Sequence, residues 1–158
     1  MKRIFSILIL SFAAAMTLNA KVELPSLFAD NMVLQQNADA AIWGKAKPDS
    51  KVTITTSWSK AKTVAQADSE GKWKTTIATP SAGGPYEITF SDGEKLTLKN
   101  VLIGEVWICS GQSNMDTRMK GYTGQPIAGA IDIITEAKAA TPIRCCTLKH
   151  IKSLTPMD

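Results

Sequence analysis

The sequence predicts a small β-sandwich followed by the beginning of an α/β domain. Apolar and polar residues alternate with a period of two in several runs between Val22 and Asn100, which is typical of strands with one buried and one solvated face. Turns rich in Gly, Pro and Asp separate these runs, at a spacing that suits about seven or eight strands. A nearly continuous apolar run then extends from Val101 to Cys109. It predicts a strand buried on both faces, in a parallel sheet covered by helices.

Three runs show the alternation most clearly, residues 52–58, 73–77 and 86–90, and Leu96 and Leu98 continue it. The turns that interrupt the pattern are Lys47-Pro48-Asp49, Glu70-Gly71, Gly83-Gly84-Pro85 and Asp92-Gly93. Asp-Gly is the strongest of them as a hairpin signal, because both residues tolerate a positive φ.

Tryptophans in this region have two interpretations. Trp43, Trp58 and Trp73 are the side chains that would form a platform for a sugar ring. The alternation instead places Trp58 and Trp73 on the buried faces of their strands and favours a role in the core.

Residues 1–20 have the features of a secretion signal. Lys2 and Arg3 precede an apolar stretch, and Ala20 fits the small-residue rule for cleavage. The uncharged stretch is short for a membrane-spanning helix, although an uncleaved anchor helix is the alternative. We therefore expect a periplasmic or extracellular protein, with no membrane association after cleavage.

Composition excludes several classes of protein. The chain of 158 residues is 44% hydrophobic and 20% charged, a balance that can bury a core and is not typical of disorder. Without the 20-residue signal, 138 residues remain, with 16 basic and 14 acidic side chains. No stripe of Lys and Arg suggests a nucleic-acid partner.

The three cysteines are Cys109, Cys145 and Cys146. They are too few for a disulfide scaffold and lack the spacing of a zinc site. Adjacent cysteines of a strand point to opposite faces, which disfavours a bond between Cys145 and Cys146. Buried small hydrophobic residues are the simpler interpretation.

Candidate chemistry lies where the apolar run stops, at residues 110–115 (SGQSNM). Ligands of open α/β sheets bind just beyond the carboxyl ends of strands. Gly111 permits a tight turn, and Ser113 would lie at its tip with an exposed hydroxyl and a free backbone N–H for an oxyanion. An ordinary helix N-cap serine is the alternative.

Three segments resemble the sialate O-acetylesterase family of SGNH-type serine esterases. They are residues 104–115 (GEVWICSGQSNM), residues 27–36 (LFADNMVLQQ) with 41–44 (AIWG), and residues 141–148 (TPIRCCTL). The resemblance implies a β-sandwich domain over residues 21–100 and the start of an SGNH/flavodoxin-like α/β hydrolase domain over 101–158.

The resemblance makes Ser113 the catalytic nucleophile and its N–H an oxyanion donor. Gly111, Gln112 and Asn114 shape the turn, and Glu105 is assigned only a structural role. One departure concerns the residues after Met115. The family continues with an acidic residue, a variable residue and Pro, whereas Asp116-Thr117-Arg118 stands here.

The catalytic base is the missing component. A serine hydroxyl needs a base, normally His, oriented by an acid, and the single histidine is His150. The family's catalytic His and Asp come far later in the chain, so a loop position is expected for His150.

The last 58 residues also hold too few elements for a complete α/β domain. Ile127, Ile131 and Ile134 predict one face of a helix between Ala128 and Ala140, and residues 143–148 predict the next strand. Two parallel strands cannot form a sheet buried on both faces. We therefore interpret the chain as the amino-terminal part of a longer esterase.

The function implied by the resemblance is removal of acetyl groups from O-acetylated sugars. A serine nucleophile would perform it without a metal or organic cofactor. The sequence does not define the sugar or the oligomeric state. The alternative is a secreted β-sandwich module that binds glycans or has a structural role, without catalytic activity.

Overall fold

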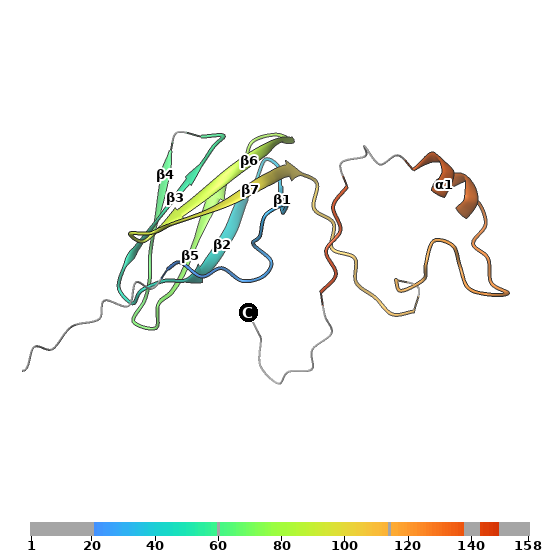
Figure 1. Cartoon of the computed structure of the whole chain (residues 1–158), viewed down its shortest axis with the longest axis horizontal. Coiled ribbons are helices and arrows are strands. Elements are labelled where there is room, and N and C mark those ends of the chain that lie inside the picture. The colour runs from blue at the N-terminus through green and yellow to red at the C-terminus, as the bar shows by residue number, and fades with distance from the viewer. Residues whose placement is uncertain (1–20, 60, 114, 138–142, 149–158) are drawn as a thin grey trace, which may run out of the picture.

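A computed structural model describes residues 21–59, 61–113, 115–137 and 143–148 (Figure 1). The predicted secretion signal, Asn114 and His150 lie outside the described residues. In the described part of the chain, no helix has the length and apolar character needed to cross a membrane.

The described chain is mostly β-structure, with seven strands and one short helix. The strands are β1 (Val33–Gln35), β2 (Asp39–Lys45), β3 (Lys51–Thr56), β4 (Lys62–Gln66), β5 (Lys72–Ala78), β6 (Gly83–Ser91) and β7 (Lys95–Gly104), and the helix is α1 (Ala130–Glu136). Five strands form one sheet in the order β1-β7-β6-β3-β4, and β2 pairs with β5 in a second sheet.

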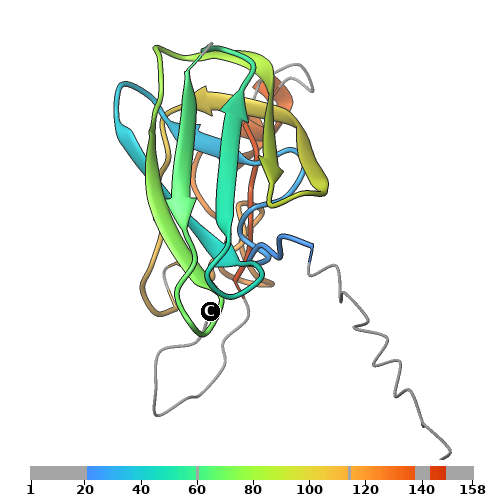
Figure 2. The ribbon, with the colours of Figure 1, turned by 90° about the vertical axis from the view of Figure 1, so that its left-hand side faces the viewer.

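One hydrophobic core lies between the two sheets. Side chains from β2 and β5, such as Ile42 and Trp73, belong to the same buried cluster as Ile54 of β3 and Phe90 of β6. Figure 2 shows β3 and β4 in front of the strand layer that contains β2. In β3 and β6, core residues two positions apart alternate with less buried ones, Val52 with Ile54 and Ile88 with Phe90, as the alternation predicts.

The predicted strands at residues 52–58, 73–77 and 86–90 correspond to β3, β5 and β6, so these predictions are confirmed. The Asp92-Gly93 turn joins β6 to β7 as an antiparallel hairpin. Trp73 is buried in the core and Trp58 packs against it, which supports the core interpretation for both.

The prediction of a turn at Gly83-Gly84-Pro85 is wrong. These residues are the first three of β6, and the β6–β7 register shifts between Gly83 and Tyr86. A β-bulge of this kind tolerates residues that cannot form a regular ladder, including a proline without an N–H. The composition of a bulge therefore resembles that of a turn.

The prediction of a doubly buried strand from Val101 to Cys109 is also wrong. Strand β7 ends at Gly104, and of the residues from Val101 to Cys109 only Val101 and Ile103 are buried. It is a strand of the five-stranded sheet, antiparallel to β6 and parallel to β1. The pairing with β6 stops at Ile103 and the pairing with β1 at Gly104, so the next residues have no ladder to join. The expected domain boundary at residue 101 thus falls inside β7.

Beyond β7 the described chain has little regular structure. Trp107 and Ile108 are 83% and 92% exposed. Helix α1 lies within the predicted range of 128–140, but Ile131 and Ile134 on its predicted apolar face are exposed. Residues 143–148 form no strand, so that prediction is wrong: within the described part of the chain they pair with none of the strands.

Candidate functional site

Ser113 lies in a tight, exposed turn after β7. The backbone N–H of Met115 donates to the carbonyl of Gln112 (3.0 Å), and the Thr117 hydroxyl donates to the carbonyl of Ser113 (3.0 Å). The turn therefore presents the serine side chain to solvent. Asn114, the next residue of the predicted site, is outside the described residues.

Gly111 is needed in this turn for space rather than for its backbone angle. A Cβ atom built on it would lie 2.5 Å from Cγ of Met115. Its φ is outside the positive range that favours glycine. Glycine at position 111 therefore avoids a clash, as expected, and the group that a Cβ atom would meet is the Met115 side chain.

The described residues bring no base to Ser113. Within them the Ser113 hydroxyl has no hydrogen-bond partner, and the lone histidine of the sequence is not among them. Nor do they contain a group of three or more His, Cys, Asp or Glu side chains that could hold a metal ion.

A network of three side chains fixes the start of the segment that leads to Ser113. The Glu105 carboxylate accepts hydrogen bonds from Nε2 of Gln36 (2.6 Å) and Nε2 of Gln35 (3.0 Å). Oε1 of Gln35 in turn accepts from the backbone N–H of Val106 (2.9 Å). We call these three residues, Gln35, Gln36 and Glu105, the clasp.

The clasp is tied to the sheet on its other side. The backbone N–H of Gln36 donates to the carbonyl of Gly104 (2.8 Å), and its side-chain oxygen accepts from the N–H of Ala82 (2.8 Å). The carbonyl of Gln35 accepts from the buried Thr79 hydroxyl (2.7 Å). Both glutamines thus link the strand layer to the segment after β7.

Glu105 is charged at neutral pH in this arrangement. The hydrogen bonds from Gln36 and Gln35 lower the pKa of Glu105 from its ordinary value of 4.5, and desolvation opposes them weakly. Both amide donors stabilise the ionised carboxylate of Glu105 more than its protonated form, because a protonated carboxyl group is a weaker hydrogen-bond acceptor.

A second contact holds the segment at residues 143–148 against the sheet. The Arg144 guanidinium donates to the carbonyl of Asn100 (2.5 Å), to Oδ1 of Asn100 (3.0 Å) and to the carbonyl of Met32 (3.2 Å). Nδ2 of Asn100 also donates to Oδ1 of Asn31 (2.6 Å). Asn31 and Asn100 both have positive φ, a conformation that asparagine tolerates better than most residues.

These contacts join the three segments that carried the family resemblance. Gln35 and Gln36 come from residues 27–36, Glu105 from 104–115, and Arg144 from 141–148. Sequence reasoning missed the roles of both glutamines, Thr79 and Arg144. The available signal was that Gln35 is the last residue of β1, with Gln36 next to it, and that Glu105 directly follows β7.

No family model matches the chain. Curated relatives include the sialate O-acetylesterase of Mus musculus, 29% identical over 83% of this chain and 25% of the relative. The sialate O-acetylesterase of Homo sapiens is 38% identical over 57% of this chain and 19% of the relative. The chain therefore spans about a fifth to a quarter of the length of the curated relatives it matches.

A solved structure shows a similar relationship to carbohydrate acetylesterases. The crystal structure of a carbohydrate acetylesterase from Xanthomonas citri aligns with a TM-score of 0.58 and 33% sequence identity, over 63% of this chain and 23% of that one. Together with the curated relatives, it confirms the resemblance found in the three sequence segments.

Proposed function

From the relationship of this chain to the sialate O-acetylesterases, we propose that it is part of an enzyme that removes acetyl groups from O-acetylated sugars. The clasp is the observation that carries the proposal. It joins the segment before Ser113 to a strand segment about 70 residues earlier in the sequence, through both oxygens of one carboxylate. A turn that presents a nucleophile must be held in place by its supports.

In the proposed reaction, the Ser113 oxygen attacks the acetyl carbonyl while a base accepts the hydroxyl proton. The oxyanion that forms on the carbonyl oxygen accepts a hydrogen bond from the Ser113 N–H. Its collapse breaks the bond between the acetyl carbon and the sugar oxygen, which takes the proton from the protonated base to become the sugar hydroxyl, and leaves an acetyl-serine ester. Water hydrolyses this ester with the same base. Gly111, Gln112 and Asn114 shape the turn, and no metal or organic cofactor takes part.

The proposed architecture is a β-sandwich, expected over residues 21–100 and here extended to the end of β7 at Gly104, followed by the start of an SGNH/flavodoxin-like α/β domain in the remaining residues up to 158. Two facts support it. The relatives are four to five times longer than the matched part. Many large apolar side chains after β7 are exposed, which suits packing against further chain. They include Val106, Trp107, Ile108, Met115, Met119, Ile131, Ile134, Ile143 and Leu148.

We further propose that a segment of a longer protein supplies the catalytic His and Asp, and that the enzyme is secreted to the periplasm or outside the cell. The features of residues 1–20 support the second point. The coding DNA beyond codon 158 tests the first. An in-frame continuation with Asp-x-x-His near its end is expected, and a long continuation without a His and Asp pair would contradict it.

Activity assays test the nucleophile. In the longer protein, Ser113→Ala should reduce release of acetate from an acetylated sugar by roughly a thousandfold or more. Ser110→Ala, an exposed serine three residues earlier, is the matched control and should retain activity. Normal activity of Ser113→Ala would exclude Ser113 as the nucleophile.

The 158-residue chain gives a second, independent assay. With p-nitrophenyl acetate it should not exceed its Ser113→Ala variant, because the described residues supply no base. Turnover above that control would show that a base is present within the chain and would contradict the proposed division of the active site.

A further inference from the structure

The two peptide units on either side of Ser113 are each held by a hydrogen bond. The carbonyl of Gln112 accepts from the backbone N–H of Met115 (3.0 Å), and the carbonyl of Ser113 accepts from the Thr117 hydroxyl (3.0 Å). Because a peptide unit is planar, the Gln112 carbonyl and the Ser113 N–H move as one group. Both backbone dihedral angles of Ser113 are therefore restrained, and with them the direction of its Cα–Cβ bond.

Thr117 is itself oriented by a second hydroxyl group, that of Tyr122. This hydroxyl donates to the carbonyl of Asp116 (3.2 Å), which belongs to the same peptide unit as the N–H of Thr117. The backbone N–H of Tyr122 donates to the carbonyl of Gln125 (3.1 Å), and the N–H of Gln125 donates to the carbonyl of Tyr122 (2.9 Å). Tyr122 therefore connects Thr117 to a small hydrogen-bonded turn.

Side-chain contacts restrict this loop more than the covalent chain does. Neither residue 117 nor residue 118 is a proline, so no ring fixes a φ angle there. In the described chain, residues 110–113 and 115–125 belong to none of the named strands or helices, so no regular ladder of backbone hydrogen bonds holds them. The backbone geometry around Ser113 thus depends on the hydroxyl groups of Thr117 and Tyr122.

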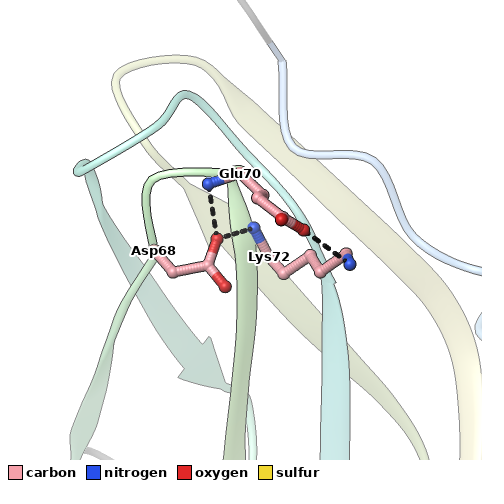
Figure 3. A network of polar contacts seen from close by, with 3 residues as sticks. All are labelled: Asp68, Glu70 and Lys72. Carbon is pink, nitrogen blue, oxygen red and sulfur yellow. Dashed lines mark hydrogen bonds and ion pairs between the residues drawn. The ribbon is translucent and has the colours of Figure 1, made fainter.

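Another turn of the chain shows how a side chain fixes a backbone in this way. Between β4 and β5, one carboxylate oxygen of Asp68 accepts from the backbone N–H groups of Glu70 (2.8 Å) and Lys72 (2.9 Å) (Figure 3). This is the ordinary use of Asp in a turn. That turn joins two strands, whereas no described strand follows the turn at Ser113, so a lost hydroxyl should affect the backbone more at Ser113.

We propose that Thr117 is a positioning residue for Ser113. By holding the Ser113 carbonyl, its hydroxyl keeps the serine oxygen directed at the acetyl carbonyl and the Ser113 N–H directed at the oxyanion. Tyr122 acts one step further away, by orienting the peptide unit between Asp116 and Thr117. The inference rests on the proposed function, and it assigns neither Thr117 nor Tyr122 a contact with the substrate.

Steady-state kinetics of the longer protein with an acetylated sugar test the role of Thr117. Thr117→Val keeps the shape but removes the hydroxyl. It should lower kcat about fivefold to tenfold and change KM less than about twofold, because the lost hydrogen bond is exposed and acts on the turn alone. Thr117→Ser keeps a hydroxyl and should restore most of the lost kcat. Thr123→Val changes an exposed threonine of the same loop and, as the matched control, should leave kcat unchanged.

NMR relaxation of the 158-residue chain gives a readout that needs no activity. Thr117→Val should lower the order parameter of the Ser113 amide toward the value of about 0.6 that is typical of flexible backbone. Tyr122→Phe should lower it less, and Thr123→Val should not change it. Asp68→Ala loosens the β4–β5 turn instead. It should lower the temperature of thermal unfolding without changing the Ser113 amide, which separates positioning from general destabilisation.

The proposal is overturned if Thr117→Val matches Thr123→Val in kcat or in the relaxation of Ser113, or if Thr117→Ser is as slow as Thr117→Val. A rise in KM without a loss of kcat would also contradict it, because Thr117 would then act in substrate binding. An inactive Ser113→Ala with unchanged kcat in Thr117→Val would refute this inference alone. Full activity of Ser113→Ala would instead refute the proposed function, whatever Thr117 does.

Discussion

The residues from Lys21 to Gly104 and those from Glu105 to Leu148 differ in how they are stabilised. The first part has two sheets around one core, and its large apolar side chains such as Phe90 and Ile42 are fully buried. Among its described residues, the second part has one short helix, and most of its large apolar side chains are exposed. In Figure 1 the strands gather on the left, and the chain from residue 105 leads away from them to α1.

This difference shows that apolar content alone does not create a core. Residues 101–109 are as apolar as any strand of the sheets, but only those up to Gly104 have paired neighbours. The second part is held to the first by polar contacts, the clasp and Arg144. Such contacts contribute modestly in water, so the two parts should respond differently to mutation.

The largest expected effect is the loss of unfolding free energy when a buried side chain of the first part is truncated, compared with an exposed one of the second part. Phe90→Ala removes a fully buried ring and should lower the free energy of unfolding by about 3–5 kcal/mol. Ile131→Ala removes a side chain that is 77% exposed and should change it by less than about 0.5 kcal/mol. Urea denaturation followed by tryptophan fluorescence measures both.

The pair also tests the exposed state of α1. If Ile131→Ala destabilised the chain as strongly as Phe90→Ala, the helix would be packed in solution and the contrast between the two parts would be wrong. Ile134→Ala on the same helix provides a second measurement, because its side chain is also exposed.

Sequence reasoning succeeded where the determinants are local. Alternation over five to seven residues located β3, β5 and β6, because the side-chain period of a strand can be read within the strand itself. The helix at Ala130–Glu136 was found in the same way. In each case neighbours in the sequence contain the information.

It failed where distant segments decide the structure. The apolar run from Val101 to Cys109 contains no sign that β7 has no paired neighbours after Gly104. The clasp joins residues 69–71 positions apart, and no local pattern reports such a pairing. For the candidate site, the sequence located the Ser113 turn and the resemblance gave its role, but neither revealed how the turn is attached.

A smaller effect is expected from Gly44→Ala in the β2–β5 sheet. A Cβ atom at this position would collide with the Glu23 carbonyl oxygen and come 3.0 Å from Cζ2 of Trp73. Because backbone atoms cannot move aside easily, the substitution should cost about 1–3 kcal/mol of unfolding free energy.

Gly104→Ala is the matched control for this prediction. Its Cβ atom would meet nothing within 4 Å, and its φ is not in the positive range. We expect it to be neutral or slightly stabilising, by up to about 1 kcal/mol. Equal destabilisation by both variants in thermal unfolding would show that residues 23–25 do not lie over Gly44.

Loss of the Arg144 contacts should have an effect confined to the second part. Arg144→Met keeps the aliphatic stem but removes three hydrogen bonds to Asn100 and Met32. The global free energy of unfolding should fall by about 1 kcal/mol or less, while NMR relaxation should show faster motion of residues 143–148. Unchanged relaxation would indicate that Arg144 does not hold this segment.

The smallest effect is expected from titration of the clasp, and it reports most directly on the attachment of the Ser113 segment. Two amide donors lower the pKa of Glu105. The carboxylate therefore stabilises the attachment of the Ser113 segment to the sheets at pH values above 4.5, the ordinary pKa of the group. This contribution should be lost as the pH falls through the lowered pKa, because a protonated carboxyl accepts these bonds less well.

NMR signals of the side-chain amides of Gln35 and Gln36 measure this transition. They should move together with a midpoint below 4.5, the ordinary value for Glu105, and Glu105→Gln should abolish the movement. Glu94→Gln, an exposed acid in the β6–β7 turn, should leave it intact. Since the N–H of Val106 binds Oε1 of Gln35, its hydrogen exchange should be roughly two- to tenfold faster in Glu105→Gln. If the glutamine signals titrate without change in that variant, another group controls them and the clasp does not connect the two parts in solution.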